Sequence, residues 1–452
     1  MNVLEPQREL SIDVFPLDGV DPARMKHKEN GNQADNLFYQ MRQDGDNKWL
    51  FICHVDKPRN EAIAWNERWD IKIKGEYQAV CYDTMDGKIY PVKAAIKDGN
   101  TIIHHIASLH DSLLLKLLAI ENSKKADSVN EVDNVAKEEV FKIPQNQKNL
   151  PEPFQYRLEE HNSLLLDMAQ YAFDEEEWQE REELLRIDNL FREKLHYPLR
   201  MEALAQPWTE KDEQKSEHVL KLRFHIYSEV EMNEVELAME HPETAEICWN
   251  GEAVEYIDSG FYVDESIRTC KLKKLQKGEN TLFVKIPFGR KTNVEWMYLL
   301  GEFGVKTIGK YGIITNLPAR LCYGDITTQN LAFYGGSLEY KSKVSTEAGI
   351  MNLEVSHYKG ALLEVFLDGE NKGSLFMAPY RKNLGKVEKG EHEITIKVYG
   401  NRSNTFGVVH NADRTESWYG PNLWRTTGNK WSYEYQLEQS AGNSCLLDRR
   451  GD

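Results

Sequence analysis

Aromatic and polar side chains that could bind a sugar are concentrated towards the end of the sequence. Six aromatic residues lie between positions 418 and 435: Trp418, Tyr419, Trp424, Trp431, Tyr433 and Tyr435. The polar residues interleaved with them are Glu416, Asn422, Arg425 and Asn429. The apolar C–H faces of a pyranose stack on indole or phenol rings, and its hydroxyl groups need fixed donors and acceptors. The cluster therefore predicts carbohydrate recognition, with Trp418 and Trp424 exposed in a loop around Gly420-Pro421.

Three of these rings also fit a different role. Trp431, Tyr433 and Tyr435 alternate along the chain, as residues on one face of a β-strand do. A strand that buries them in a core accounts for the three as well as a binding site does. The full set of candidate carbohydrate-binding residues is Tyr334, Tyr380, Arg381, Asn404, His410, Trp418, Trp424 and Arg425.

Catalysis on sugars would need a pair of carboxyl groups in addition to a binding surface. Glycoside hydrolysis uses two carboxyl groups held roughly 5 to 9 Å apart across the scissile bond. Glu295, beside Trp296, and Glu302, in a glycine-rich stretch, are the carboxylates to inspect. A structural role is the favoured interpretation of both, because the chain has no barrel to position them. We therefore assign no catalytic residue.

No motif indicates a metal or cofactor. His104 and His105 are adjacent, so on a strand they point to opposite faces and cannot easily share one ion, and His110 adds no fixed spacing. The sequence also lacks a G-x-S-x-G, a P-loop and a G-x-G-x-x-G after a strand. The cysteines are far apart, form no C-x-x-C pair and are expected to be reduced thiols: Cys53, Cys81, Cys248, Cys270, Cys322 and Cys445.

Charge and hydropathy exclude other partner classes. The 452 residues carry a net charge of -17, with 73 acidic against 56 basic residues. This balance argues against nucleic acid and anionic membrane surfaces as partners. No run of 18 apolar residues exists. The polar, acidic start from Met1 to Leu10 does not resemble a secretory signal, so we expect a cytoplasmic protein.

The first 118 residues predict an antiparallel β-sandwich. Asp44-Gly45, Asp86-Gly87 and Asp98-Gly99 are dipeptides that accept positive φ, and they separate β-rich runs. These runs are Asn36 to Arg42, Trp49 to Val55, Trp69 to Ile73, Tyr77 to Tyr82, Ile89 to Ile96, Thr101 to Ile106 and Ser112 to Ala119. A polar segment that ends in several prolines follows, and it predicts a linker over 119–154.

Beyond the linker, one helix and a duplicated β unit are expected. An acidic run from Asp174 to Glu183 leads into apolar residues at helical spacing, which predicts a single amphipathic helix near 175–197 with carboxylates favoured at its start. A metal site is the less favoured interpretation of that run. The hairpin dipeptide Asn250-Gly251 precedes Lys277-Gly278-Glu279-Asn280, and Asp368-Gly369 precedes Lys389-Gly390-Glu391-His392. Each pair feeds an alternating strand, so the sequence predicts two stacked jelly rolls.

These units resemble the sugar-binding jelly rolls, of galactose-binding-like fold, in family 2 glycoside hydrolases and bacterial α-L-rhamnosidase-like enzymes. The segments that carry the resemblance in the last copy are Gly324-Asp325-Ile326-Thr327, Phe333-Tyr334-Gly335-Gly336, Glu364 to Gly369, Ala378-Pro379-Tyr380-Arg381, and the tail positions Asn404, Gly407, His410, Trp418, Gly420, Pro421 and Trp424. The earlier copy is similar through Asn162 to Asp167, Val263 to Ile267 and Leu299 to Val305. Two positions depart from the family pattern, Ile326 for Trp and Asp368 for Asn. Residues 36–118 look like the small sandwich that follows the catalytic barrel.

The resemblance implies an all-β fold of tandem sandwiches and a function. It divides the chain into a small β-sandwich (1–118), a linker (119–154), a jelly roll with the helical insertion (155–315), a second jelly roll (316–440) and a tail (441–452). The enzymes carry their carboxylates on a (β/α)8 barrel of about 250 residues, and no such segment is present. The resemblance therefore implies a non-catalytic, carbohydrate-binding accessory region of a bacterial glycoside hydrolase that binds a plant or microbial oligosaccharide. The alternatives are a structural module that docks on a barrel-bearing partner and, less favoured, a self-contained glycoside hydrolase.

Overall fold

The structure is a computed structural model, and it describes 13 stretches of the chain. They are residues 2–3, 9–18, 32–33, 36–55, 66–85, 87–108, 110–120, 147–199, 216–357, 359–377, 380–413, 430–440 and 444–450. Strands dominate these stretches, which confirms the predicted all-β class. The helical pieces described are α2 (Leu184–Lys194), α3 (Ser403–Phe406), η6 (Pro242–Thr244) and η7 (Ile326–Thr328). No helix in the described stretches is both long and apolar enough to cross a membrane.

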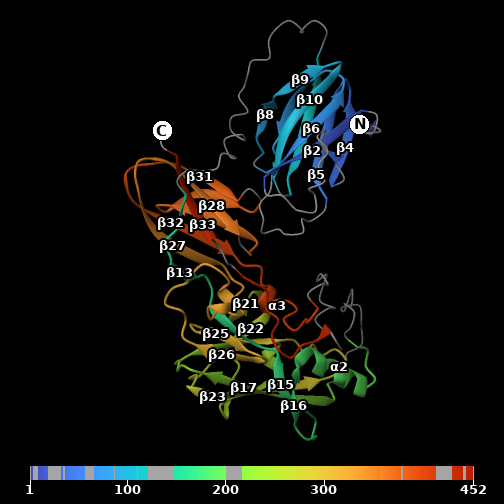
Figure 1. Cartoon of the computed structure of the whole chain (residues 1–452). Helices are drawn as coiled ribbons and strands as arrows, with labels where there is room; N and C mark the ends of the chain where they lie inside the picture. The colour runs from blue at the N-terminus through green and yellow to red at the C-terminus, as the bar shows by residue number, and fades with distance from the viewer. Residues whose placement is uncertain are drawn as a thin grey trace.

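The N-terminal unit is a sandwich of two antiparallel sheets (Figure 1). One sheet has the order β1 (Asn2–Val3), β4 (Leu37–Asp44), β5 (Asn47–His54), β11 (Ser112–Ala119), β7 (Tyr77–Tyr82) and β8 (Ile89–Val92). The other has the order β3 (Asn32–Gln33), β2 (Leu10–Asp18), β6 (Asn66–Lys74), β10 (Asn100–Ser108) and β9 (Ala94–Lys97). The expected runs therefore form strands, and the run Ile89 to Ile96 forms two. Asp98 and Gly99 both take positive φ, of 52° and 69°, as the predicted hairpin turn requires.

The next unit along the chain, which we call the first jelly roll, also has two main sheets. One sheet has the order β14 (Asn162–Leu166), β24 (Met297–Gly301), β18 (Val235–Glu240), β22 (Asp264–Leu272) and β21 (Asp258–Tyr262). The other has the order β16 (Gln179–Glu183), β15 (Met168–Phe173), β17 (His218–Ser228), β23 (Gly278–Phe288), β19 (Glu246–Trp249) and β20 (Glu252–Val254). A hairpin of β25 (Gly304–Ile308) and β26 (Tyr311–Thr315) extends this sheet beside β17.

The second jelly roll has the same design. One sheet has the order β12 (Gln147–Asn149), β33 (Ser444–Arg450), β28 (Gly349–His357) and β31 (Arg381–Val387). The other has the order β13 (Gln155–Leu158), β27 (Leu338–Thr346), β32 (Gly390–Tyr399), β29 (Leu362–Leu367) and β30 (Glu370–Leu375). Alternate residues of β32 such as Ile394, Ile396 and Val398 are buried, as the period of a half-buried strand requires.

The duplication inferred from the sequence is present in the strand order. The row β15-β17-β23-β19-β20 of the first jelly roll corresponds to β13-β27-β32-β29-β30 of the second, and β14-β24-β18-β22 corresponds to β12-β33-β28-β31. The two hairpin turns also match, with φ of 50° and 83° at Asn250-Gly251 and 51° and 84° at Asp368-Gly369. Both dipeptides can hold two consecutive positive φ angles at low cost.

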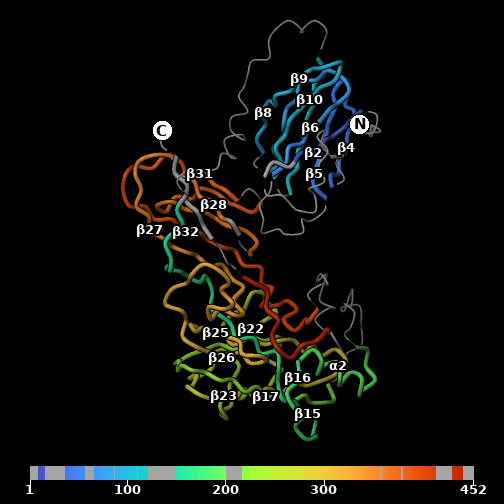
Figure 2. The backbone as a smooth tube through the Cα atoms, in the orientation of Figure 1, coloured from blue at the N-terminus to red at the C-terminus, as the bar shows by residue number. Residues whose placement is uncertain are grey.

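The jelly rolls are nested, not consecutive. The second jelly roll begins at β12 and β13, the chain then builds the whole first jelly roll, and it returns at β27 to pair with β13 (Figure 2). The expected linker thus supplies β12 and the expected tail supplies β33, which pair with each other. The sequence predicted neither strand, because their partners lie almost 300 residues apart and leave no local turn signal.

Helix α2 lies within the predicted span 175–197, but it begins only at Leu184, because the acidic run before it is not helical. The run forms the β15–β16 turn and β16 itself, and only Glu183 reaches the helix. Its carboxylate accepts hydrogen bonds from the backbone N–H groups of Leu185 and Arg186, each at 2.9 Å, so it caps the helix. The apolar face of α2, including Leu184, packs into the core of the first jelly roll.

The two jelly rolls share a polar and apolar junction. The Arg402 guanidinium makes two hydrogen bonds to the Glu160 carboxylate, at 2.7 and 2.6 Å. Phe333 and Val409 come from the chain of the second jelly roll but are buried in the core of the first. The Thr405 hydroxyl donates to the Phe333 carbonyl oxygen at 2.9 Å. These contacts join the two units into one packed body.

The nested order predicts the effect of a short C-terminal truncation. Removing residues 441–452 deletes β33, which lies between β12 and β28, so both neighbours lose their hydrogen-bonding partner and the core of the second jelly roll opens. We expect its thermal transition to fall by on the order of 10 °C or to disappear in calorimetry. A chain lacking only residues 451–452 is the control. Equal melting of the two truncated chains would contradict a structural role for β33.

Candidate functional site

Three separate parts of the chain meet at one surface of the first jelly roll. They are β16 with the start of α2, the β25–β26 hairpin, and the segment 430–436, which follows the second jelly roll's strand β32. Backbone hydrogen bonds fix the segment: Tyr435 N–H donates to the Gly309 carbonyl oxygen at 3.1 Å, and Ser432 N–H donates to the His410 carbonyl oxygen at 2.9 Å. The segment is not the strand that alternation of its rings suggested, since Trp431 forms only an isolated bridge to Asn411.

Cationic side chains lie over aromatic rings in this region. The side chains that form it, here called the aromatic–arginine patch, are Arg181, Glu182, Arg186, Lys310, Tyr311, Trp431 and Tyr433. The guanidinium carbon of Arg181 lies 5.0 Å from the Tyr311 ring centre, and that of Arg186 lies 4.8 Å from the Trp431 ring centre. Both distances are within the range of cation–π attraction. Tyr311 is 50% exposed and Tyr433 is 44% exposed, so their rings can be reached from solvent.

One acidic side chain links the parts of the patch. The Glu182 carboxylate accepts two hydrogen bonds from Arg186, at 3.0 and 3.3 Å, and one from the Tyr433 hydroxyl at 3.1 Å. Strand β16, helix α2 and the segment 430–436 therefore hold one another in place. The patch offers flat apolar faces together with positioned polar groups, which is the chemistry that sugar recognition uses.

A buried polar cluster lies beneath the patch and anchors it. The fully buried Asp167 carboxylate accepts hydrogen bonds from His410 Nε2 and the Tyr435 hydroxyl, each at 2.7 Å. His410 Nδ1 lies 2.8 Å from the Ser432 carbonyl oxygen, which can only accept. Both ring nitrogens of His410 thus face acceptors, which is the pattern of an imidazolium. The segment is joined to the β14–β15 turn through a buried charged pair.

Burial and charge act against each other in this cluster. Burial alone would lower the pKa of His410, but its hydrogen bond to Asp167 and the negative charges of Asp167 and Glu183 raise that pKa overall. For Tyr435, burial and the charge of Asp167 raise the pKa well above its usual value, so the phenol remains a hydrogen-bond donor.

Glu183 is the second buried carboxylate. Besides capping α2, it accepts a hydrogen bond from the Trp296 indole N–H at 2.6 Å. Complete burial raises the pKa of Glu183 to about 7, against the hydrogen bonds from Trp296 and the helix N–H groups, and the charge of Asp167 adds to the increase. Asp167 and Glu183 are a pair of neighbouring carboxylates, but neither is exposed and both are engaged in hydrogen bonds. In this conformation neither can contact a glycosidic bond.

The sequence-based candidates occupy varied positions. His410 is in the buried cluster. Asn404 is buried and exchanges two hydrogen bonds with the backbone of Glu438, at 2.7 and 2.8 Å. Tyr334 is buried, donates to the Ser337 carbonyl oxygen at 2.5 Å and accepts from Glu159 N–H at 3.2 Å. These three side chains contribute to the fold of this region and offer no face to a ligand.

Other candidates lie apart from the patch or outside the description. Tyr380 packs partly buried against the core of the second jelly roll, and Arg381 Nε lies 3.7 Å from the Glu354 carboxylate. Trp418, Trp424 and Arg425 fall outside the described residues, so their part in sugar binding stays a prediction.

The two carboxylates singled out for inspection are not brought together. Glu295 precedes β24 and Glu302 follows it, and a five-residue strand is roughly 16 Å long. That span exceeds the roughly 5 to 9 Å that a glycosidase pair requires. The Glu302 side chain is 70% exposed and lies 3.2 Å from His161. The sequence did not single out the neighbouring pair Asp167 and Glu183, which meet because β15 and β16 pair with Met168 opposite Glu183.

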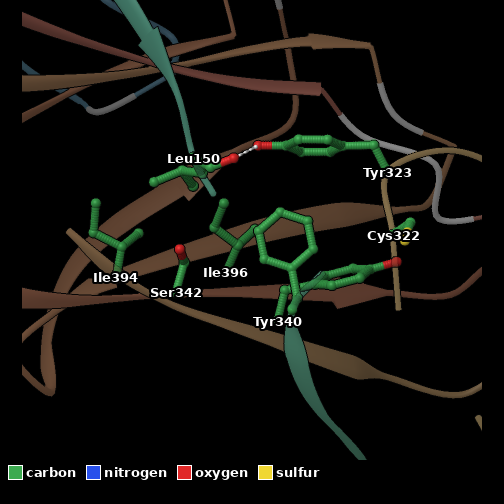
Figure 3. Close-up of a pocket in the computed structure, with 8 residues that line it drawn as sticks. Leu150, Cys322, Tyr323, Tyr340, Ser342, Ile394 and Ile396 are labelled. Carbon is green, nitrogen blue, oxygen red and sulfur yellow. Dashed lines mark hydrogen bonds between the residues drawn. The ribbon is translucent and has the colours of Figure 1, made fainter. Parts of the chain in front are cut away.

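A small pocket opens in the second jelly roll (Figure 3). Its lining comes from the chain between β12 and β13, from the stretch that precedes η7, and from β27 and β32: Leu150, Phe154, Cys322, Tyr323, Tyr340, Ser342, Ile394 and Ile396. The Tyr323 hydroxyl donates to the Leu150 carbonyl oxygen at 2.8 Å across its rim. The pocket has room for about one water molecule, so a sugar ring does not fit.

Comparison with known proteins yields only distant structural neighbours. No family model matches the chain, and a search of curated proteins gives no match. Among solved structures, it is similar to a rhamnosidase from Novosphingobium sp. PP1Y at 11% identity, with 97% of this chain and 25% of that chain covered and a TM-score of 0.35. A GH2 beta-galacturonidase from Eisenbergiella tayi matches at 9% identity, with 55% and 37% covered and a TM-score of 0.19.

A third neighbour is also a glycoside hydrolase. Beta-D-mannosidase from Dictyoglomus thermophilum matches at 11% identity, with 53% of this chain and 31% of that chain covered and a TM-score of 0.21. The chain spans about a quarter of the length of the rhamnosidase and about a third of the other two.

The buried cluster predicts a pH dependence of stability. Because the folded pKa of Glu183 is raised from 4.5 to about 7, the folded state keeps a proton that the unfolded state loses, and the free energy of unfolding falls as pH rises between these values. A raised His410 pKa acts in the same direction, since its contribution is lost as pH rises through the folded value. The effect of Glu183 is on the order of 2 to 3 kcal/mol.

Thermal denaturation at pH 5 and pH 8 measures this effect. We expect the first jelly roll to melt at a higher temperature at pH 5, and Glu183→Gln to reduce the difference because the amide keeps an acceptor oxygen without the charge. Glu255→Gln, at an exposed position, is the matched control. An unchanged difference between the two pH values in Glu183→Gln would count against the raised pKa.

Proposed function

We propose that this chain is a carbohydrate-binding accessory region of a glycoside hydrolase whose catalytic domain lies elsewhere. The observation that carries the proposal is the aromatic–arginine patch, where the exposed rings of Tyr311 and Tyr433 lie among positioned charged groups. An oligosaccharide would stack on these rings and exchange hydrogen bonds with Glu182 and the arginines. Because the rings come from different parts of the chain, the site exists only in the folded protein.

The buried cluster supports binding without reorganisation. Tyr433 lies between Ser432 and Tyr435, and both of these neighbours are held by hydrogen bonds to the cluster of His410 and Asp167. A ring that is already fixed loses little conformational freedom when a sugar stacks on it. The proposed occupant is a plant or microbial oligosaccharide.

A docking role is the second candidate function. Ile308 is 56% exposed at the turn of the β25–β26 hairpin, next to the patch, and an aliphatic side chain adds contact area for a protein more than for a sugar. In this case the same surface would bind a barrel-bearing partner. Sugar titration separates the two functions.

Isothermal titration against rhamnose-, galactose- and uronate-containing oligosaccharides tests the first proposal. We expect at least one oligosaccharide to bind, and Tyr311→Ala and Tyr433→Ala each to weaken its binding by about five- to tenfold, since each removes a stacking face. Phe261→Ala is the control, because Phe261 is also exposed but lies on β21 in the opposite sheet.

Two outcomes would redirect the proposal. No binding across the panel would leave the docking function ahead. Binding that survives both tyrosine substitutions would move the site away from the patch, and the double variant Trp418→Ala with Trp424→Ala would then test the loop predicted from the sequence.

A further inference from the structure

Two cations in the aromatic–arginine patch lack a counter-charge. Most neighbouring basic groups are paired, as Arg186 is with Glu182 and Lys306 with Glu229. Neither Arg181 nor Lys310 has a carboxylate within ion-pair distance in the described part of the chain. The protein has a net charge of -17, so carboxylates are plentiful, and the lack of an ion pair between these two groups and the described residues is a local property.

Both cations lie against the same exposed ring. The Arg181 guanidinium carbon is 5.0 Å and the Lys310 ammonium nitrogen 5.7 Å from the Tyr311 ring centre, so the two charges are at most about 11 Å apart. Arg181 Nε donates to the Met168 carbonyl oxygen at 3.3 Å, which fixes the start of the guanidinium and leaves its terminal N–H groups for another acceptor.

This arrangement favours an anionic ligand with a flat apolar face. Two like charges beside one ring repel each other, and an anion placed between or beside them removes that repulsion. A sugar ring in contact with the exposed part of Tyr311 would bring its substituents close to both cations. The planar fork of arginine matches a carboxylate in a two-bond geometry, whereas lysine adds a point charge.

We propose that the patch selects acidic sugars, with the carboxylate of a uronic acid residue bound by Arg181 and Lys310 while the ring stacks on Tyr311. The inference rests on the proposed function, because it names the ligand class of the same site. Exposed Glu434 lies beside Gly309 at the hairpin turn, and as a carboxylate it can accept hydrogen bonds from hydroxyl groups but cannot bind a sugar carboxylate.

The test compares uronate trimers with the neutral trimers made by reducing their carboxyl groups. Galacturonate, glucuronate and mannuronate trimers are titrated into the full chain at low and high salt. We expect at least one uronate trimer to bind ten times or more tightly than its reduced form at low salt, and the preference to shrink as salt rises.

The variants assign that preference to the two cations. Lys310→Gln and Arg181→Gln should each weaken binding of the uronate several-fold and leave the reduced trimer unaffected. Lys277→Gln removes an exposed charge outside the patch and should change neither. Lys310 is on the hairpin surface, so its variant tests the inference even where thermal denaturation shows that Arg181→Gln is misfolded.

The remaining outcomes distinguish this inference from the proposed function. Equal binding of uronate and reduced trimers, both dependent on Tyr311, would overturn the acidic preference and keep the sugar site. Equally tight binding of sulfated neutral trimers would overturn the assignment to a carboxylate. No binding of any trimer or of the wider oligosaccharide panel would overturn both.

Discussion

The hydrogen bonds from His410 and Tyr435 to Asp167 hold the candidate site together. The segment 430–436 has no strand partner of its own beyond one bridge, so its position depends on these side-chain bonds and a few backbone bonds. A buried carboxylate is stable only when its charge is compensated, and His410 supplies that compensation from the other end of the junction. The cost of burying one ion is thus offset only when both jelly rolls are folded and in contact.

The nested topology also makes the folding of the second jelly roll depend on segments from both ends of the insertion and from the end of the chain. The second jelly roll needs β12 and β13 from before the first jelly roll and β33 from the end of the chain. The Glu160–Arg402 pair ties the start of the insertion, where the chain leaves β13, to the segment that follows β32. A rigid connection at this point keeps the patch in a fixed orientation relative to the second jelly roll.

The sequence predicts turns and helices that depend on neighbouring residues. It does not predict contacts between segments that are far apart along the chain. Asn250-Gly251 and Asp368-Gly369 revealed the duplicated hairpins because only a few dipeptides accept two positive φ angles. The spacing from Leu184 onwards predicted a helix where α2 lies, but the start of the predicted span 175–197 was wrong because β16 takes up part of the acidic run. The cluster of aromatic residues drew attention to the segment that carries Tyr433, but nothing near Arg181 or Tyr311 in the sequence indicates that they meet it, since that contact depends on how β16 and the β25–β26 hairpin pack.

The buried cluster also explains why exposed side chains of the patch have fixed positions. Glu183 and Glu182 are adjacent on β16, and their side chains alternate as strand residues do, one buried beside Trp296 and one at the surface beside Tyr433. Glu183 caps the start of α2, and the helix positions Arg186, whose guanidinium hydrogen-bonds to Glu182. Two consecutive residues of β16 therefore join the buried cluster to the surface where we propose that sugars bind.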